Sequence, residues 1–359
     1  MTQLFADIRD KIDHNQRLSD DEALALARCD DLLALGELAA LANRRRNGDK
    51  VFFNRNRHLN YGNVCVNRCA FCAFRRDGEE PGAYLLTPEE IGERAAVAAA
   101  AGATELHVVG GLHPGLPLDY YLDLLGEVRR RAPQLHIKAF TAVEIEHLHR
   151  LCGLPLPVLL AKLRAAGVDS LPGGGAEIFA AAVRRKICPD KISGERWLEI
   201  MAEVHGAGLR SNATMLFGHL ESWPDRIDHL ARLRRLQDET SGFMAFIPLP
   251  YQDENTRLPG VRGPGGVDIL KTLAISRLYL DNFRHLKAYW VMLGVKLAQV
   301  ALAFGVNDLD GTVVEERIGH AAGAESPQTL RGDQLADLIR KAGRRPVERD
   351  SLYRELGEY

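Results

Sequence analysis

The sequence predicts an α/β fold: a TIM-type βα barrel, complete or partial, with a helical extension before it and a second extension after it. Short apolar runs alternate with longer amphipathic runs from about Phe52 onward, a pattern typical of parallel strands joined by right-handed helical crossovers. At least six such units occur in one stretch, which favours a closed or nearly closed barrel over an open doubly wound sheet. Polar and glycine-rich clusters directly follow the strand candidates. In a βα barrel these positions converge on one catalytic face.

The individual elements follow from this periodicity. The strand candidates are residues 59–64, 105–109, 136–142, 168–171, 211–216 and 242–248, with a weaker one at 285–289. The helix candidates are residues 88–101, 118–131, 156–166, 176–185, 194–208, 225–240 and 267–281. The helix candidates carry apolar residues at helical spacing, which predicts one face buried against the strands.

Three regions of the chain differ in character. Residues 1–50 are predicted to be helical, with Ser19 or Asp20 as the cap of an apolar-periodic stretch over 22–42. Residues 51–307 are predicted to form the barrel. Residues 308–359 are rich in Gly, Pro and charged residues, with one more helix near 329–342. We expect this last region to pack on the barrel or to cap it.

Composition and charge narrow the classes of function. The 359 residues are 46% hydrophobic and 26% charged, which is ordinary for a globular chain with a large core. The formal net charge of −2 provides no basic field for a polyanion, so nucleic acid is not expected as a partner. The N-terminus lacks the apolar core of a secretory signal, and no apolar run approaches the roughly 20 residues that span a bilayer. We therefore expect a cytoplasmic protein without membrane contact.

Three cysteines are crowded directly after the first strand candidate. Cys65, Cys69 and Cys72 form a Cys-x3-Cys-x2-Cys motif, which is a poor disulfide framework and indicates a metal site. Structural zinc normally takes four ligands, whereas three thiolates on a [4Fe-4S] cluster leave one iron open for a substrate or cofactor. We favour the cluster, and zinc completed by a distant ligand is the alternative. The scattered cysteines, for which no role follows, are Cys29, Cys152 and Cys188.

Two further loops have the composition of ligand-binding turns. Gly110 and Gly111 end the second strand candidate, where glycine either lets a ligand approach the backbone or simply permits a tight turn. Three consecutive glycines at 173–175 precede Glu177 and, further on, Arg184. Such a segment is a poor core element but a good ligand cradle. Glu177 and Arg184 could equally be solvated helix residues.

Four polar residues at other strand ends are candidates for substrate binding. Thr141 and Glu144 follow the third strand candidate, Asn212 lies on the fifth, and His219 follows it. Asn212 shares a face with Thr214 because side chains alternate along a strand, so both reach the cavity only if that face points inward. A lone histidine such as His219 is more often structural than catalytic.

The cysteine motif, placed after the first strand of a βα barrel and with an aromatic residue before its last cysteine, resembles the hallmark of the radical S-adenosylmethionine enzymes. The resemblance implies that the three cysteines hold a [4Fe-4S] cluster, whose open iron takes the amino and carboxylate groups of S-adenosylmethionine. One-electron reduction would then break the S–C5′ bond and give a 5′-deoxyadenosyl radical. The residues that would bind S-adenosylmethionine are Phe71, Gly110, Gly111, Glu177 and Arg184. The protein would supply binding, orientation and exclusion of water, and the cofactor the chemistry.

Six segments narrow the resemblance to the aminofutalosine (aminodeoxyfutalosine) synthases of the futalosine route to menaquinone. The segments are residues 63–74, 107–114, 138–145, 170–179, 212–219 and 236–243. The resemblance implies a transferase that adds the radical to the vinyl carbon of 3-[(1-carboxyvinyl)oxy]benzoate and forms 6-amino-6-deoxyfutalosine. Bicarbonate or carbon dioxide and methionine would be released. A one-electron donor such as ferredoxin or flavodoxin is the implied partner.

Two alternatives to the synthase remain open. Its sister, the dehypoxanthine futalosine cyclase, shares the glycine-rich segment, but Val109 and Thr141-Ala142 stand where the cyclase tends to carry Gln and a Ser-Pro segment, which favours the synthase. The alternative of a different class is a non-catalytic zinc- or ligand-binding barrel.

The two substrate carboxylates of the synthase would suit guanidinium forks, and the candidates by position are Arg57, Arg75 and Arg210.

Overall fold

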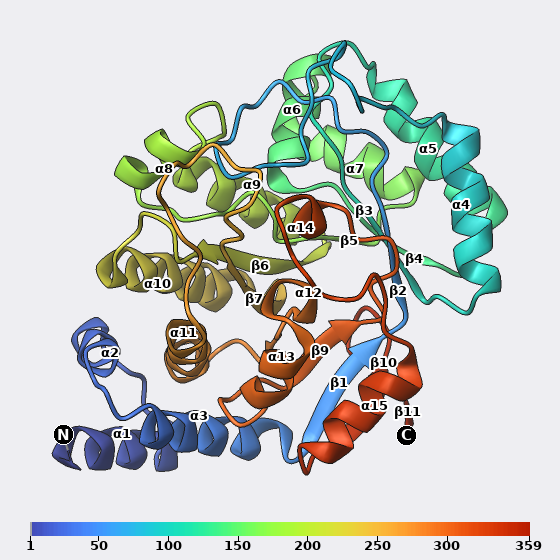
Figure 1. Ribbon diagram of the computed structural model, residues 1–359. Coiled ribbons are helices and arrows are strands. Elements are labelled where there is room, and N and C mark those ends of the chain that lie inside the picture. The colour runs from blue at the N-terminus through green and yellow to red at the C-terminus, as the bar shows by residue number, and fades with distance from the viewer. Residues whose placement is uncertain (1) are drawn as a thin grey trace.

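The computed structural model describes residues 2–359 and has a curled parallel sheet of seven strands at its centre (Figure 1). The strands lie in chain order, as consecutive βα units require. They are β2 (Asn56–Leu59), β3 (Glu105–Val108), β4 (His136–Ala139), β5 (Ser170–Leu171), β6 (Arg210–Phe217), β7 (Phe243–Pro250) and β8 (His285–Leu286). The barrel-type α/β fold predicted from the sequence is confirmed.

Helices cover the outer side of this sheet (Figure 1). They are α4 (Pro88–Ala100), α5 (Leu118–Arg131), α6 (Ala142–Cys152), α7 (Leu156–Ala166), α8 (Ala181–Ile187), α9 (Gly194–Gly206), α10 (Trp223–Thr240) and α11 (Gly266–Tyr279). Capping boxes begin three of them: Thr87, Thr141 and Ser222 each accept from the backbone three residues on, where an acidic side chain returns a bond. Local sequence therefore determines where these helices start.

Three elements near the carboxyl ends of the strands differ from the predicted ranges. The first strand ends at Leu59, and beyond it the chain makes only isolated pairings before the cysteine motif. Helix α6 occupies residues predicted as strand and loop, because Thr141 and Glu144 form its capping box. Helix α8 begins at Ala181 rather than at 176, since Glu177 has a φ of 49°, a left-handed conformation that an α-helix excludes.

The two ends of the chain meet in a second, four-stranded sheet. Its order is β11-β10-β1-β9, with β1 (Lys50–Asn54), β9 (Asp308–Gly311), β10 (Arg345–Arg349) and β11 (Glu355–Glu358). The N-terminal helices are α1 (Thr2–Asp13), α2 (Asp20–Ala27) and α3 (Leu32–Asn47), of which α3 packs on α11. The remaining helices are α12 (Trp290–Leu293), α13 (Val295–Ala301), α14 (Ile318–Ala321) and α15 (Gly332–Lys341). No helix within residues 2–359 is long and apolar enough to cross a membrane.

Residues 307–314 lie between the first and last strands of the central sheet. On the β8 side, the Ala288 N–H donates to the Asp308 carbonyl at 2.9 Å. On the β2 side, the His58 N–H donates to the Val314 carbonyl at 2.8 Å. The C-terminal region, expected to pack on or cap the barrel, thus also contributes backbone that joins its two edges.

Candidate active site

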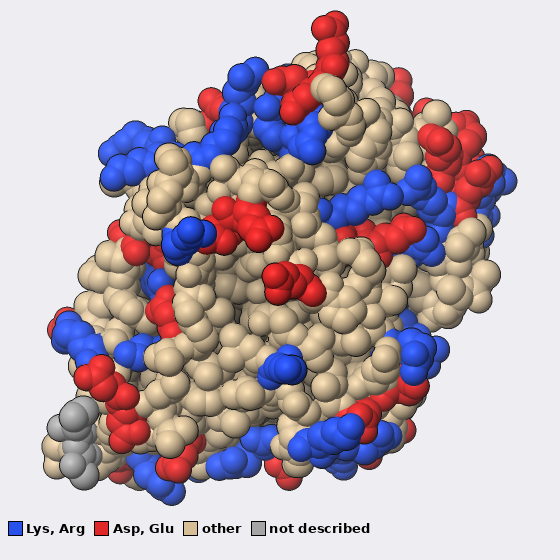
Figure 2. Space-filling model, viewed as in Figure 1, with Lys and Arg blue, Asp and Glu red and all other residues tan. Residues whose placement is uncertain are grey.

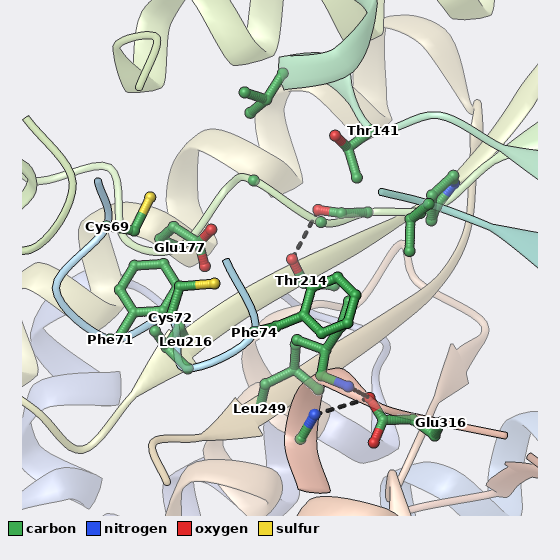
Figure 3. Close-up of a pocket in the computed structure, with 18 of the residues that line it drawn as sticks. Cys69, Phe71, Cys72, Phe74, Thr141, Glu177, Thr214, Leu216, Leu249 and Glu316 are labelled. Atoms are coloured by element: carbon green, nitrogen blue, oxygen red, sulfur yellow. Dashed lines mark hydrogen bonds between the residues drawn. The ribbon is translucent and has the colours of Figure 1, made fainter. Parts of the chain in front are cut away.

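A cavity of about 330 Å³ lies inside the curled sheet, lined by the inner faces of the strands and by the loops that follow them. Figure 3 shows Cys69 and Cys72 on one side of it and Glu316 on the other. Phe74 and Leu249 lie between these two sides. Apolar side chains make up much of the wall: Val109, Leu112, Val143, Leu216, Ile247, Leu249 and Met292. The cavity therefore suits a largely apolar ligand with polar groups at its ends.

Backbone hydrogen bonds hold the cysteine loop over this cavity. The Val66 N–H donates to the Leu112 carbonyl at 2.9 Å, and the Ala70 N–H donates to the Ile187 carbonyl at 2.7 Å. The loop is thus tied both to the glycine loop after β3 and to the end of α8. All three cysteines of the motif line the cavity, as the sequence analysis expects for a shared metal centre.

Burial affects the ionisation of two of these thiols. It raises the pKa of Cys65, and it raises the pKa of Cys69 to about 12. A bound cationic centre would supply the charge that converts them to thiolates.

The glycine pair after β3 is packed too closely for side chains. A Cβ on Gly111 would lie 2.2 Å from the Val64 carbonyl oxygen. The Gly110 N–H donates to the Glu144 carboxylate at 3.0 Å, and the Tyr61 O–H donates to the same carboxylate at 2.8 Å. Glu144, predicted as a substrate contact, lines the cavity but is already occupied by these protein donors. Its carboxylate therefore holds the backbone amide of Gly110 in place.

Glu177 lines the cavity beside the cysteines, and the sequence analysis missed its partner. The Lys191 ammonium pairs with the Glu177 carboxylate and lies 5.0 Å from the centroid of the Phe71 ring. Burial favours the neutral amine, yet Cys69 and Glu177 hold the pKa of Lys191 above its usual value. A charged lysine thus lines the cavity next to the motif. No local pattern predicts it, since only the fold brings the loop after α8 to this point.

Arg184, predicted to bind the carboxylate of S-adenosylmethionine, is not among the described residues that line the cavity. Its guanidinium donates to the carbonyls of Ala176 and Ile178, at 2.5 and 3.1 Å, and to that of Ile192 at 2.5 Å. The side chain therefore fixes the shape of the glycine-rich turn from behind, because its donors are used on backbone.

His219, predicted as a substrate contact, also lies outside the described lining of the cavity. Its Nδ1 lies 3.0 Å from the Glu221 carboxylate, and both side chains are fully buried. Burial alone would raise the pKa of Glu221, but the bond to His219 and the nearby Arg226 lower it to about 2. This pair braces the loop after β6.

Asn212, Thr214 and Thr141 line the cavity. The Thr214 hydroxyl donates to the Gly173 carbonyl at 2.7 Å, and Thr141 caps α6. Asn212 is only 3% exposed, and its Oδ1 has no hydrogen-bond partner among the described residues. A buried amide oxygen without a partner is costly, so Asn212 is the polar side chain of this group that is left for a ligand.

The inner faces of the strands carry polar side chains that the sequence analysis missed. Barrel interiors are normally filled with branched apolar residues. Here Lys138 pairs with Glu105 at 2.6 Å, and Lys287 pairs with Asp310 at 2.5 Å. Two imidazoles accompany them in the cavity lining, those of His58 and His107. The signal in the sequence was polar residues at alternate strand positions, such as Glu105 and His107.

Of the three arginines proposed for the substrate carboxylates, one lines the cavity. Arg57 pairs with Glu315 at 2.7 Å and is not part of the described lining, and Arg210 is exposed at the amino end of β6. Arg75 lines the cavity and pairs with Asp77.

Known proteins resemble this chain in sequence and in fold. The family model described as the radical SAM superfamily matches residues 59–233, and the model described as the CofH/MqnC C-terminal region matches residues 240–358. Among solved structures, methylornithine synthase has a TM-score of 0.76 and 18% sequence identity over 94% of this chain and 97% of that chain. An [FeFe]-hydrogenase maturase, HydG, has a TM-score of 0.74 and 16% identity over 97% of this chain and 76% of that chain. These two likenesses show the fold.

Curated relatives are much more similar in sequence. Aminodeoxyfutalosine synthase of Thermus thermophilus is 46% identical over 97% of this chain and 95% of the relative. The enzyme of the same name from Streptomyces coelicolor is 44% identical over 99% of this chain and 95% of the relative. A 5-amino-6-(D-ribitylamino)uracil–L-tyrosine 4-hydroxyphenyl transferase of Methanopyrus kandleri is 44% identical over 87% of this chain and 86% of the relative.

The parallel barrel, its three-cysteine loop and the superfamily match together define a radical S-adenosylmethionine enzyme. Such enzymes use a [4Fe-4S] cluster and S-adenosylmethionine. Membership of this superfamily excludes the alternative of a non-catalytic zinc-binding barrel. Within the superfamily, the chain belongs to the aminodeoxyfutalosine synthase family, as its likeness to two such enzymes over nearly their whole length shows.

The residues that line the cavity fit a [4Fe-4S] cluster and S-adenosylmethionine. Three thiols reach the cavity from one loop, and no fourth cysteine lines it in the part of the chain that is described. This donor set suits a cluster with one open iron. The Asn212 Oδ1 has no hydrogen-bond partner among the described residues, and the glycine pair brings backbone without side chains to the cavity, so both fit contact with S-adenosylmethionine.

Proposed function

We propose that this chain joins the 5′-deoxyadenosyl group of S-adenosylmethionine to 3-[(1-carboxyvinyl)oxy]benzoate and forms 6-amino-6-deoxyfutalosine for menaquinone biosynthesis. The proposed conversion takes up water and releases methionine, bicarbonate and a proton. The observation that carries it is the near full-length likeness to aminodeoxyfutalosine synthases, combined with an apolar cavity that begins at the cysteine loop.

In this proposal Cys65, Cys69 and Cys72 hold the [4Fe-4S] cluster. The cluster, when bound and reduced, supplies the electron that cleaves the S–C5′ bond of S-adenosylmethionine. Around it, the backbone of Gly110 and Gly111 and the carboxylate of Glu177 orient the methionine part. Glu144 and Arg184 act as positioning residues, because they fix the two glycine turns and use their polar atoms on protein groups.

The rest of the cavity is the proposed site of the aromatic substrate. Leu216, Ile247, Leu249 and Phe74 provide apolar walls for a benzene ring. These walls exclude water from the reacting carbons, which a radical addition requires. The vinyl group must lie within about 3–3.5 Å of C5′, so its end of the substrate belongs near the cysteine loop.

A second candidate is the transfer reaction between 5-amino-6-(D-ribitylamino)uracil and L-tyrosine. The observation that favours it is the 44% identity to the transferase of Methanopyrus kandleri. That relative covers less of this chain than the two synthases do. The remaining candidate is the cyclisation of dehypoxanthine futalosine, which is also a radical S-adenosylmethionine reaction.

The deciding experiment is product analysis with anaerobically reconstituted enzyme and S-adenosylmethionine under a chemical reductant. Three parallel incubations contain 3-[(1-carboxyvinyl)oxy]benzoate, the ribitylaminouracil with tyrosine, or dehypoxanthine futalosine. We expect the mass of aminofutalosine in the first incubation only. Reconstituted Cys72→Ser enzyme is the matched control and should yield none. A coupled product in the second or third incubation, with none in the first, would overturn the proposal.

The physiological reductant is proposed to be a small acidic one-electron donor such as ferredoxin or flavodoxin. Its docking surface is the exposed basic rim of the cysteine loop, formed by Arg68, Arg185, Lys186 and Arg257. Arg257 also donates to the Cys69 carbonyl at 3.2 Å. Figure 2 shows blue side chains gathered over α8, which carries two of these residues. This partnership, and the thiols of the motif, place the enzyme by our proposal in the reducing cytoplasm.

Electrostatic docking predicts a salt-sensitive rate of reduction. We expect Arg185→Glu with Lys186→Glu to slow reduction by the protein donor about tenfold at low salt, while dithionite reduces the variant normally. Arg340→Glu, on the exposed side of α15, is the matched control. Equal rates in all three proteins would contradict this docking surface.

A further inference from the structure

Two imidazole rings lie parallel on the inner wall of the cavity. The rings of His58 and His107 are 4.5 Å apart between centroids, with 13° between their planes. The strand ladder sets this spacing, because His58 on β2 pairs in register with His107 on β3. Tyr289 continues the row, with its ring 6.4 Å from that of His58 and 17° between the planes. All three side chains line the cavity.

The ring nitrogens of both imidazoles are free of protein hydrogen bonds within residues 2–359. No hydrogen bond or ion pair joins a ring nitrogen of His58 or His107 to another of the described residues. Buried histidines normally have a partner for each ring nitrogen. The donors and acceptors of this pair are therefore available to whatever occupies the cavity.

The cations around the cavity are already neutralised. Within the described lining, each lysine and arginine has a carboxylate partner: Arg75 with Asp77, Lys138 with Glu105, Lys191 with Glu177, and Lys287 with Asp310. An anionic ligand that enters finds no unpaired cation there. A proton taken up at the site would balance its charge, and an unpaired buried charge is strongly unfavourable.

The imidazoles are the groups able to take that proton. Burial lowers the pKa of His58 and lowers that of His107 well below its usual value, so both are neutral at pH 7. The charges that face them are the carboxylates Glu105, Asp310 and Glu316, which favour protonation, and the ammonium of Lys138, which opposes it. At this separation one ring can be charged but not both, because two like charges repel.

We propose that the His58–His107 pair binds the benzoate carboxylate of the aromatic substrate, and that the pair takes up one proton from solvent as this carboxylate binds. The inference rests on the proposed function. The vinyl end of the substrate belongs beside the cysteines, so the benzoate carboxylate points across the cavity. Glu316, which interacts electrostatically with His58, lies on that far side (Figure 3).

The test is calorimetric titration of reconstituted enzyme with 3-[(1-carboxyvinyl)oxy]benzoate, without reductant, so that no turnover occurs. Runs at pH 7.5 in buffers of different ionisation enthalpy report the protons taken up. We expect about one proton per ligand in the unmodified protein. The same ligand with a carboxamide in place of the benzoate carboxylate should bind at least about tenfold more weakly and take up none.

Two variants locate the proton. His107→Asn and His58→Asn each remove one imidazole of the pair. Each variant leaves the carboxylate with one imidazole instead of two, so we expect a dissociation constant raised at least about tenfold in both. Proton uptake should fall in the variant that lacks the ring which takes the proton. His14→Asn, at an exposed position next to α1, is the matched control and should titrate like the parent. Circular dichroism establishes that the variants are folded.

The outcomes separate this inference from the proposed function. Binding of the substrate without proton uptake, or unchanged uptake in both histidine variants, would overturn the role of the pair. The first of these needs no variant, so a folding defect cannot obscure it. Aminofutalosine formed by such an enzyme would leave the proposed function intact. Absence of aminofutalosine from the unmodified enzyme would instead overturn the function on which the inference rests.

Discussion

The backbone amide of Gly110 donates a hydrogen bond of 3.0 Å to the carboxylate of Glu144. Glu144 also accepts from the Tyr61 hydroxyl and from the Thr141 amide, at 2.8 and 2.7 Å. Burial raises the pKa of this carboxyl group. One buried side chain thus joins the glycine loop after β3, the strand end that leads to the cysteine motif, and the start of α6.

Removing this carboxylate should affect both stability and cofactor binding. Glu144→Ala leaves three donors without their acceptor, so we expect a loss of roughly 2–4 kcal/mol in the free energy of unfolding. S-adenosylmethionine should bind about tenfold more weakly, because the glycine backbone is no longer held. Tyr61→Phe removes a single bond and should cost only about 1 kcal/mol. Urea denaturation measures the stability and equilibrium dialysis measures the binding of S-adenosylmethionine. Equal losses in the two variants would refute the role of Glu144 as a common acceptor for the three donors.

We expect the proposed cluster ligands to be dispensable for the fold. Cys69→Ser should leave the circular dichroism spectrum unchanged but reduce reconstituted iron far below the roughly four atoms per chain of a complete cluster. It should also abolish formation of 5′-deoxyadenosine from S-adenosylmethionine. Cys152→Ser, on α6 and outside the described cavity lining, is the matched control and should retain both properties. Undiminished 5′-deoxyadenosine from Cys69→Ser would refute the ligand assignment.

The loop that carries Glu316 should lose stability in alkali. The bond between His320 and Glu316, at 2.9 Å, raises the pKa of the imidazole from 6.5 to about 9. A raised histidine pKa stabilises the folded state fully below about pH 6.5, and this contribution is lost as the pH rises through about 9. Hydrogen exchange of the α14 amides should therefore accelerate over this range beyond the intrinsic rate. In His320→Gln the extra acceleration should be absent; its persistence would assign the effect to another group.

Two glycine substitutions test the closure of the barrel. A Cβ on Gly311 in β9 would lie 2.2 Å from Asn54 Oδ1 and 2.5 Å from the Asn54 carbonyl oxygen. We expect Gly311→Ala to destabilise the protein by about 2 kcal/mol or more, because overpacking forces the backbone apart. Gly126 is exposed within α5 with nothing near its Cβ position. Gly126→Ala should therefore stabilise by roughly 0.5–1 kcal/mol. Urea denaturation of both variants gives the comparison, and a neutral Gly311→Ala would argue against a tight junction.

Some predicted site residues meet at the cavity, and others do not. The three cysteines, the glycine pair and Glu177 could be predicted because each lies in a short motif directly after a strand candidate. Arg184 and His219 have suitable spacing in the sequence, but their polar atoms are used on backbone and on Glu221. Spacing in the sequence predicts the helical turn on which a residue lies, but it does not predict which groups accept its hydrogen bonds.

The sequence by itself determined the order of βα units, the capped starts of the helices and the three-thiol loop. These features depend on local periodicity and on residues a few positions apart, so the interactions that set them lie within one strand, one turn or one helix end. The tertiary structure alone decided that residues 307–314 join the two edges of the barrel and that Lys191 lies beside Glu177. It also decided that His58 stacks on His107. Such contacts depend on strand register and on the curvature of the whole sheet, which no short stretch of sequence encodes.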